Sequence, residues 1–193
     1  MKLSNRKVST IQSQIADILR SELIFGDYLP GEKLNEQDLA ERFEVSRGPI
    51  REVLLILYKE GLIESKRNCG NFVCQPLSKP VEELMQSFKQ SIEQFAVSGQ
   101  VSASRTQHKS LALLLTQMDL HLKHQELSEY KVAEIEFQQL FIELAAGKDL
   151  SNLWYLIAIR VQQNKEPLEV LSKRLENFTA QLDGLQQSKP LNQ

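Results

Sequence analysis

Along the first sixty residues, apolar side chains recur at helical spacing in three separate stretches. The first stretch predicts a helix from about Val8 to Phe25, closed by Gly26, because its apolar residues return every three or four positions. Those residues are Ile11, Ile15, Ile18, Leu19 and Leu23. A second helix is expected through EQDLAERF after a cap at Asn35, and a third after a cap at Ser46. The buried stripe of the third consists of Ile50, Val53, Leu54 and Leu57.

The second and third helices are joined by the short segment FEVS, and two helices connected in this way form a helix-turn-helix. Two β-prone runs follow, GLIES and NFVCQ, separated by KRNCG. A hairpin directly after a helix-turn-helix is a wing. The pattern therefore predicts a winged helix-turn-helix domain over residues 1–75.

The remainder of the chain shows helical patterns only. After a proline-bounded linker, PLSKP at residues 76–80, helices are expected at about 81–97, 103–124, 127–146, 149–163 and 167–186, and no convincing strand is found. Residues 81–193 thus form an all-α bundle. The expected fold class is mostly α: an N-terminal winged helix-turn-helix of three helices and a β-hairpin wing, followed by an all-α helical bundle.

Composition and charge limit the classes of partner. The net charge of the 193 residues is −2, and residues 1–75 hold 11 Lys+Arg and 11 Asp+Glu, so any DNA-binding surface must be local. No apolar run approaches the roughly 18 residues of a membrane span. The N-terminus has positive charge without a following apolar core, so a secretory signal is not expected. Two cysteines and no export signal predict a cytoplasmic protein that does not contact a membrane.

The start of the third helix carries the most informative chemistry. Pro49 has no N–H, so the Ser46 oxygen is expected to bond the N–H of Gly48 or to contact a phosphate. Gly48 would let another backbone come close. Arg47 and Arg51 stand four residues apart and project from one face, away from the apolar stripe. A guanidinium can bind guanine O6 and N7 with two hydrogen bonds or fork onto phosphate, and residues at this end of such a helix reach base edges.

These residues also carry a family resemblance. Residues 10–74, with the text LPGEKLNEQDLAERFEVSRGPIREVLLILYKEGLIESKRNCGNFV, resemble the winged helix-turn-helix of GntR-family bacterial transcription regulators. The helical second domain is similar to the FadR-like branch of that family. The resemblance implies a homodimeric, sequence-specific regulator that binds double-stranded operator DNA, with repression the expected sign.

The resemblance also implies roles for particular residues. On the recognition helix, base edges and phosphates would be met by Ser46, Arg47, Gly48, Pro49 and Arg51. Gln37 on the second helix takes a position that can touch the DNA backbone. Arg67, Asn68 and Gly70 fall at the tip of the wing, which enters the minor groove in the family.

Some residues depart from the family pattern. Glu44 stands where glycine is frequent in the turn, and a left-handed conformation there should cost about 1–2 kcal/mol. Leu55 and Ile56 make the recognition helix more apolar than usual, and Cys69 replaces a common basic residue of the wing. These departures leave an alternative open, a helical dimeric interaction protein with weakened DNA reading.

For the second domain, the resemblance implies a dimerisation role and a small carboxylate effector, in many members with a bound metal. Glu134, Gln138 and Asn177 take positions that correspond to ligands of that metal, and they are the candidate effector-binding residues. Glutamine and asparagine are poor ligands for zinc or nickel, so no metal and no cofactor are expected. A regulator without any effector is the alternative.

No constellation in the sequence predicts an enzyme, since a nucleophile–base pair and a ligand cluster are both missing from the pattern. His121 and His124 lie three apart near a helix end, with His108 upstream, which allows either a surface metal clip or solvated side chains. Cys69 and Cys74 flank the expected hairpin turn and are either two reduced thiols or a redox-sensitive disulfide.

Overall fold

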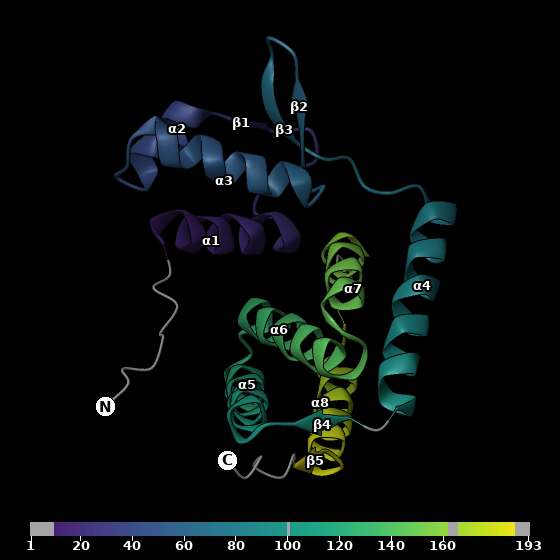
Figure 1. The fold of residues 1–193 in the computed structure, drawn as a ribbon. Helices are drawn as coiled ribbons and strands as arrows, with labels where there is room; N and C mark the ends of the chain where they lie inside the picture. Colours follow the sequence, from purple (N-terminus) through teal and green to yellow (C-terminus); the bar gives the residue numbers. More distant parts are fainter. Residues whose placement is uncertain (1–9, 100, 162–165, 188–193) are drawn as a thin grey trace. The chain divides into compact units, whose positions relative to one another are not determined.

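Helix α1 (Ile11–Phe25) is the first element of the fold (Figure 1). It begins after Thr10, whose hydroxyl accepts a hydrogen bond from the N–H of Ser13 at 3.2 Å. The helix ends at Gly26, which has a φ of +87° that glycine adopts without strain. The predicted helix is confirmed. Its expected start at Val8 lies outside the residues that this computed structural model describes, which are 10–99, 101–161 and 166–187.

Helices α2 (Glu36–Arg42) and α3 (Arg47–Lys59) complete the predicted helix-turn-helix. Asn35 caps α2 by accepting a hydrogen bond from the N–H of Gln37 at 2.9 Å. The turn between the helices places Glu44 in the left-handed region with φ +53°, as its position in the turn suggested. Helix α3 packs on α1, and its predicted stripe is buried. The buried residues of α3 are Ile50, Val53, Leu54 and Leu57.

The wing is an antiparallel hairpin of β2 (Ile63–Lys66) and β3 (Gly70–Val73), with Glu64 opposite Phe72. A two-residue strand, β1 (Lys33–Leu34), adds to the free edge of β3 and makes a sheet of order β1-β3-β2. The sequence pattern did not predict β1, because so short a strand has no periodicity of its own and depends on a partner nearly forty residues away.

Over its described residues, the second unit contains the five predicted helices, with ends that differ by a few residues. They are α4 (Lys79–Ser98), α5 (Arg105–His124), α6 (Leu127–Ala146), α7 (Lys148–Val161) and α8 (Leu168–Asp183). Gln162 and Gln163, which the pattern included in α7, lie outside the described residues. The core is built on large side chains with almost no exposure, among them Tyr130, Phe137 and Trp154. Phe137 also contacts Phe178 of α8 with ring centroids 4.9 Å apart.

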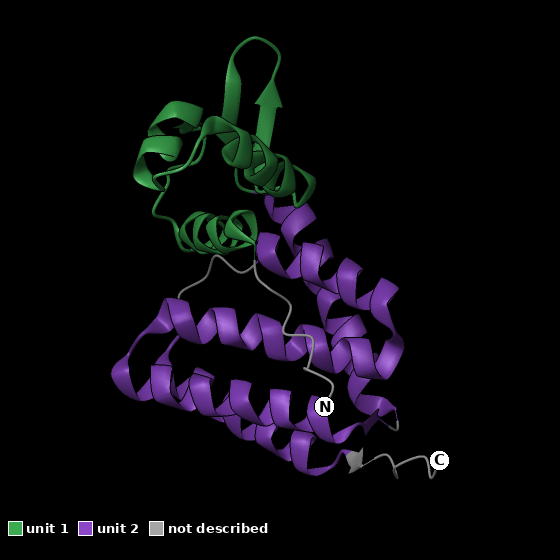
Figure 2. Cartoon of the chain, turned by 60° about the vertical axis from the view of Figure 1, so that its left-hand side comes forward, with its two compact units in different colours: residues 1–76 green, residues 77–193 purple. Residues whose placement is uncertain are grey.

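Two features of this unit differ from the sequence prediction. Residues 102–103 (β4) and 186–187 (β5) form a short parallel pair, although no strand was expected there. Helix α4 begins at Lys79, inside the segment expected to be a linker, because Ser78 stands at its N-cap and Pro80 is tolerated in a first turn. The chain divides into compact units Met1–Pro76 and Leu77–Gln193 (Figure 2). Within the described ranges, no helix has the length and apolar character that crossing a membrane requires.

Candidate nucleic-acid interface

The N-terminus of α3 exposes the residues expected to meet DNA. Ser46 occupies the N-cap with extended backbone angles, but its side chain makes no cap hydrogen bond, so the expected bond to the N–H of Gly48 is not formed. Pro49 supplies no N–H at the third helical position, and the Ser46 oxygen therefore stays accessible. Ser46, Arg47 and Gly48 are all exposed. This end of the helix offers a hydroxyl and a glycine surface to another molecule.

Arg51 is held by the helix that precedes it. Its Nε donates a hydrogen bond to Oε2 of Glu36 at 2.8 Å, which joins the first turn of α2 to α3. The side chain of Arg51 remains 64% exposed. Hydrogen bonding to Glu36 raises the pKa of Arg51 above its ordinary value, so this side chain is a permanent cation.

Arg47 is also held by a hydrogen bond to a side chain of α2, but its partner is neutral. Its Nη2 donates to Oε1 of Gln37 at 2.6 Å, and the Gln37 amide donates in turn to Glu41 at 3.1 Å. The structure thus brings Gln37 to Arg47, two of the residues singled out from the sequence. Glu36 was not singled out, because only the packing of α2 on α3 places it beside Arg51.

The tip of the wing contains Arg67, Asn68 and Gly70, all of them exposed. Asn68 and Gly70 have φ of +61° and +105°, the left-handed conformations that let the hairpin reverse within three residues. The hairpin tip therefore presents one exposed cation and two small residues to the solvent.

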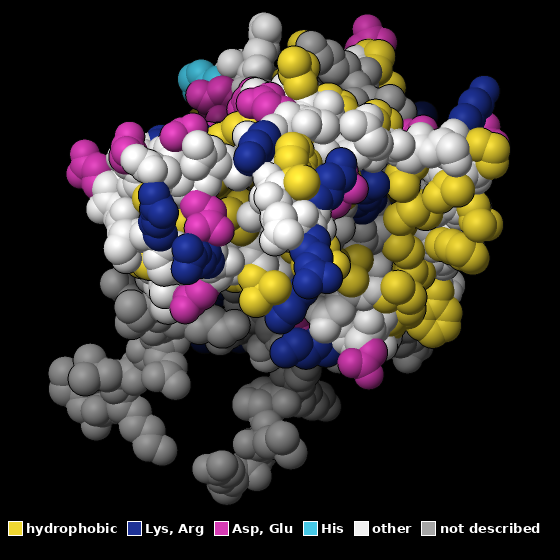
Figure 3. Space-filling view, turned by 90° about the horizontal axis from the view of Figure 1, so that it is seen from above, with side chains coloured by type: hydrophobic (Ala, Val, Ile, Leu, Met, Phe, Trp, Pro, Cys, Tyr) yellow, Lys and Arg dark blue, Asp and Glu magenta, His cyan; other side chains and the backbone are white. Residues whose placement is uncertain are grey.

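Lys33 is a further cation of the wing that sequence reasoning missed. The ammonium groups of Lys33 and Lys66 lie 5.9 and 4.9 Å from the ring centroid of Phe72. A Cβ built on Gly70 would come within 3.2 Å of the Lys33 side chain, so β1 carries its lysine to the base of the wing tip. Figure 3 shows the face on which the wing lies, with Lys and Arg side chains interspersed with acids. No local signal could have found Lys33, because β1 pairs with β3 only in the folded sheet.

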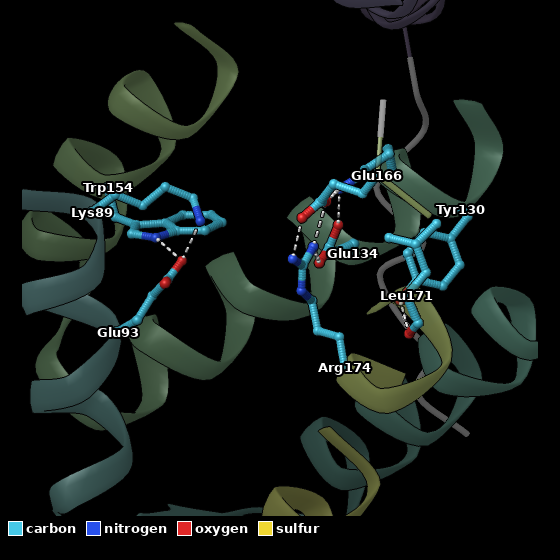
Figure 4. A network of polar contacts seen from close by, with 9 residues as sticks. Lys89, Glu93, Tyr130, Glu134, Trp154, Glu166, Leu171 and Arg174 are labelled. Carbon is cyan, nitrogen blue, oxygen red and sulfur yellow. Dashed lines mark hydrogen bonds and ion pairs between the residues drawn. The ribbon is translucent and has the colours of Figure 1, made fainter. Parts of the chain in front are cut away.

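In the second unit, Glu134 and Gln138 line a cavity of about 400 Å³ between α4, α6 and α7. Glu134 is buried and binds two cations, with its oxygens 2.7 Å from Nη1 of Arg174 and 3.1 Å from Nζ of Lys131. Glu166 binds both of the same cations and completes a four-charge cluster (Figure 4). Hydrogen bonding to Arg174 is the largest of the effects that lower the pKa of Glu166 to about 2.

The third candidate of this unit, Asn177, is exposed and lines a different hollow, beside Val101 and Phe141. The structure therefore does not bring it to Glu134. Arg174, one turn earlier on α8, stands at the cavity instead. The packing of α8 thus turns Arg174, and not Asn177, towards this cavity.

The neighbours of Glu134 do not fit a bound divalent metal, since an ammonium and a guanidinium group cannot serve as ligands. Among the described residues, no group of three His, Cys, Asp or Glu side chains comes together. His121 lies with Nδ1 2.7 Å from the Glu126 carboxylate. Cys69 is exposed, and no disulfide joins it to Cys74.

Comparison with known proteins identifies the first unit. Residues 11–73 match the model of the family described as bacterial regulatory proteins, gntR family. Residues 11–73 therefore form a domain of the GntR family. The matched residues cover α1, the helix-turn-helix and the whole wing, so the exposed arginines and the wing tip described above belong to a GntR-family DNA-binding domain. The comparisons do not reach the FadR-like branch.

Relatives of known sequence are similar over most of the chain. The uncharacterized HTH-type transcriptional regulator YdhC of Bacillus subtilis (strain 168) is 28% identical over 144 residues, which are 72% of this chain and 63% of that protein. The HTH-type transcriptional repressor RspR of Escherichia coli (strain K12) is 28% identical over 137 residues, 70% of this chain and 59% of that protein. The matched stretches thus span less than two thirds of the length of these two relatives.

A solved structure, that of McbR/YncC from E. coli, superposes with a TM-score of 0.64 at 17% identity and covers 91% of this chain and 89% of that one. At this identity the similarity concerns the fold. It confirms the predicted fold class, a winged helix-turn-helix followed by a helical unit.

Proposed function

We propose that this GntR-family protein is a dimeric transcriptional repressor that acts on operator DNA in the cytoplasm and is controlled by a small molecule bound in its helical unit. The observation that carries the proposal is the pair of exposed arginines at the start of α3, each held by one side chain of α2. One similar protein is named a repressor, which favours repression as the sign. The relatives named above are regulators, and the proposal assigns no catalytic reaction.

DNA contact would use the nine residues that the sequence singled out. In the recognition helix and α2 they are Gln37, Ser46, Arg47, Gly48, Pro49 and Arg51, and in the wing they are Arg67, Asn68 and Gly70. Guanidinium groups at the start of α3 suit guanine edges and phosphates in the major groove. The wing cations, including Lys33 and Lys66, suit the phosphates that flank the neighbouring groove.

Dimerisation is supported by an unpartnered apolar face on α4. Val81, Leu84, Phe88 and Phe95 are 44%, 54%, 52% and 60% exposed and follow the spacing of a heptad row. The row extends over about 21 Å of helix at 1.5 Å per residue. A second copy of the chain is the proposed occupant, because a heptad row packs against its own copy about a two-fold axis and two reading heads match two half-sites.

Control by an effector is supported by the cavity at Glu134 and Gln138, whose volume of about 400 Å³ suits a small ligand. The small carboxylate that the family resemblance implies would compete with Glu134 and Glu166 for Arg174. Figure 4 shows that these side chains come from α6, α8 and the residues before α8. A ligand that draws Arg174 away from Glu134 and Glu166 would loosen the connection between those elements. The ligand would thereby change the relative stability of two conformations of the helical unit, and this change is the proposed signal.

The proposal is tested by fluorescence anisotropy with the intergenic DNA upstream of the gene and an unrelated duplex, at low and physiological salt. Selective binding should fall steeply with salt and be lost in the variant Arg47→Ala/Arg51→Ala. Arg105→Ala/Lys109→Ala, which removes two exposed cations from the second unit, is the charge-matched control and should bind as the unaltered protein does. If a folded dimer shows no selectivity for these fragments or for a genomic fragment library, the protein is not an operator-binding regulator.

A further inference from the structure

The hydrogen bond between Arg51 and Glu36 engages one particular nitrogen. Nε of Arg51 donates to Oε2 of Glu36, and within the described part of the chain no hydrogen bond involves the two terminal nitrogens of this guanidinium. A guanidinium is planar and carries five N–H donors in a fixed fork. Because Nε is the donor nearest the stem, a partner at Nε fixes the plane of the group while leaving its far edge with four N–H donors.

That far edge is the part of arginine that binds guanine. Two terminal N–H groups, one on each Nη, lie at the spacing of O6 and N7, so an end-on contact needs both of them and not Nε. Arg51 is 64% exposed, and its free edge therefore remains accessible to a base. The carboxylate of Glu36 thus orients the guanidinium of Arg51 without occupying the Nη N–H groups that would contact a base.

The charge of Glu36 adds a second effect. A carboxylate at 2.8 Å from Arg51 repels a phosphate that approaches the same guanidinium, whereas a guanine edge presents neutral acceptors. Arg47 has a different environment, because its partner Gln37 is a neutral amide. The two arginines therefore differ in the charge of their partners. Arg51, beside a carboxylate, disfavours contact with phosphate, whereas Arg47, beside a neutral amide, does not.

The pair has little to contribute to the stability of the fold. The side chains of Arg51 and Glu36 are 64% and 33% exposed, and exposed ion pairs of this kind typically stabilise a protein only slightly. Glu36 stands in the first turn of α2, where a carboxylate also interacts favourably with the helix N-terminus, but Asp38 occupies the same turn and can supply that effect. The specific consequence of Glu36 is therefore its effect on Arg51.

We propose that Glu36 is a positioning residue for DNA sequence reading, which orients Arg51 for an end-on contact with a guanine and turns it away from phosphate. The proposal rests on the proposed function, since it concerns how the same interface selects its DNA. It adds to that function a residue that does not itself touch a base.

The test is selection of bound duplexes from a randomised pool by the full-length protein and by four variants. Arg51→Ala should flatten the preference at one base pair in each half-site, and Glu36→Ala should flatten the preference at that same base pair. Glu36→Gln keeps an oxygen acceptor and should retain most of this preference. Asp38→Ala removes an exposed carboxylate from the same turn and should leave it unchanged. Binding of each variant to a scrambled duplex is measured in parallel, where Glu36→Ala should bind about threefold or more tightly than the unaltered protein.

The outcomes separate the two proposals. If the unaltered protein enriches no motif, both the proposed function and the role of Glu36 are overturned. If it enriches a motif and Glu36→Ala keeps the base preference that Arg51→Ala loses, the positioning role alone is wrong. A loss of preference spread evenly over all positions, or an equal effect of Asp38→Ala, also contradicts it. Thermal unfolding at the unaltered temperature excludes a folding defect as the cause.

Discussion

Arg20 of α1 and Glu60 at the end of α3 form a two-point ion pair, with Nε and Nη2 of the arginine each 2.8 Å from a different carboxylate oxygen. Their side chains are only 17% and 12% exposed. The pair connects α1 to the end of α3, so it couples the N-terminal helix to the helix that carries the recognition residues. Such two-point contacts are stronger and more specific in geometry than single ion pairs.

Removing one partner of this pair should therefore destabilise the DNA-binding unit. Arg20→Ala leaves the carboxylate of Glu60 mostly buried and without its two-point partner, and we expect a loss of about 2 kcal/mol in the free energy of unfolding. Hydrogen exchange of the α1 and α3 amides, followed by mass spectrometry, measures this unit separately. Arg51→Ala, which removes an exposed arginine, is the control and should change protection little. Equal protection in both variants would show that the Arg20–Glu60 pair is as weak as a surface pair.

Substitution of Gly48 should separate folding from DNA binding. A Cβ at this position would meet only the Ser46 Oγ, at 3.9 Å, and alanine is the better helix former by about 1 kcal/mol. Gly48→Ala should thus fold at least as stably as the unaltered chain but bind DNA at least tenfold more weakly, because the new methyl group occupies the space through which a DNA backbone approaches. Thermal unfolding and anisotropy on the same preparation measure the two effects. Undiminished DNA affinity would mean that no backbone comes close to this glycine.

The apolar row of α4 should control the oligomeric state. Leu84→Glu/Phe88→Glu places two carboxylates in the row and should convert a dimer to a monomer, as measured by sedimentation equilibrium. Leu113→Glu on α5 is the matched control, since Leu113 is 59% exposed and lies outside the row. A dimer that survives the double substitution would place the interface on another surface.

The charge cluster predicts a specific response to acid. The pKa of Glu166 is lowered from 4.5 to about 2, chiefly by its hydrogen bond from Arg174. A lowered carboxyl pKa in the folded state means that the ionised group stabilises the fold above pH 4.5, and that this contribution disappears as the pH falls towards 2. Because Glu166 is partly exposed, solvent screening reduces the size of the effect.

Glu166→Gln should accordingly be less stable than the unaltered chain at neutral pH, with a difference that shrinks between pH 4.5 and 2. Trp154 is the single tryptophan and is buried in the second unit, so its fluorescence reports urea unfolding of that unit alone. Glu176→Gln, at an exposed glutamate of α8, serves as the control. Parallel curves for Glu166→Gln and the unaltered chain over this pH range would contradict the assigned ion pairs.

Much of this architecture was predictable because its determinants are local. Apolar stripes at helical spacing, the cap at Asn35 and the glycine at position 26 identify helices without reference to the rest of the chain. Arg47 and Arg51 were recognisable as an exposed pair for the same reason, since a spacing of four residues places two side chains on one helix face whatever the helix packs against.

Only the tertiary structure decided which side chains meet across elements. Lys33 joins the wing through a two-residue strand, Glu36 reaches Arg51 across the helix-turn-helix, and Arg174 rather than Asn177 enters the cavity at Glu134. Each of these contacts depends on the rotation or register of one element against another, which is set by packing of the whole core and leaves no periodic trace in the local sequence. The sequence by itself therefore determined the helices, the wing and the exposed arginines. The packing of those elements determined which side chains orient the arginines and pair with their charges.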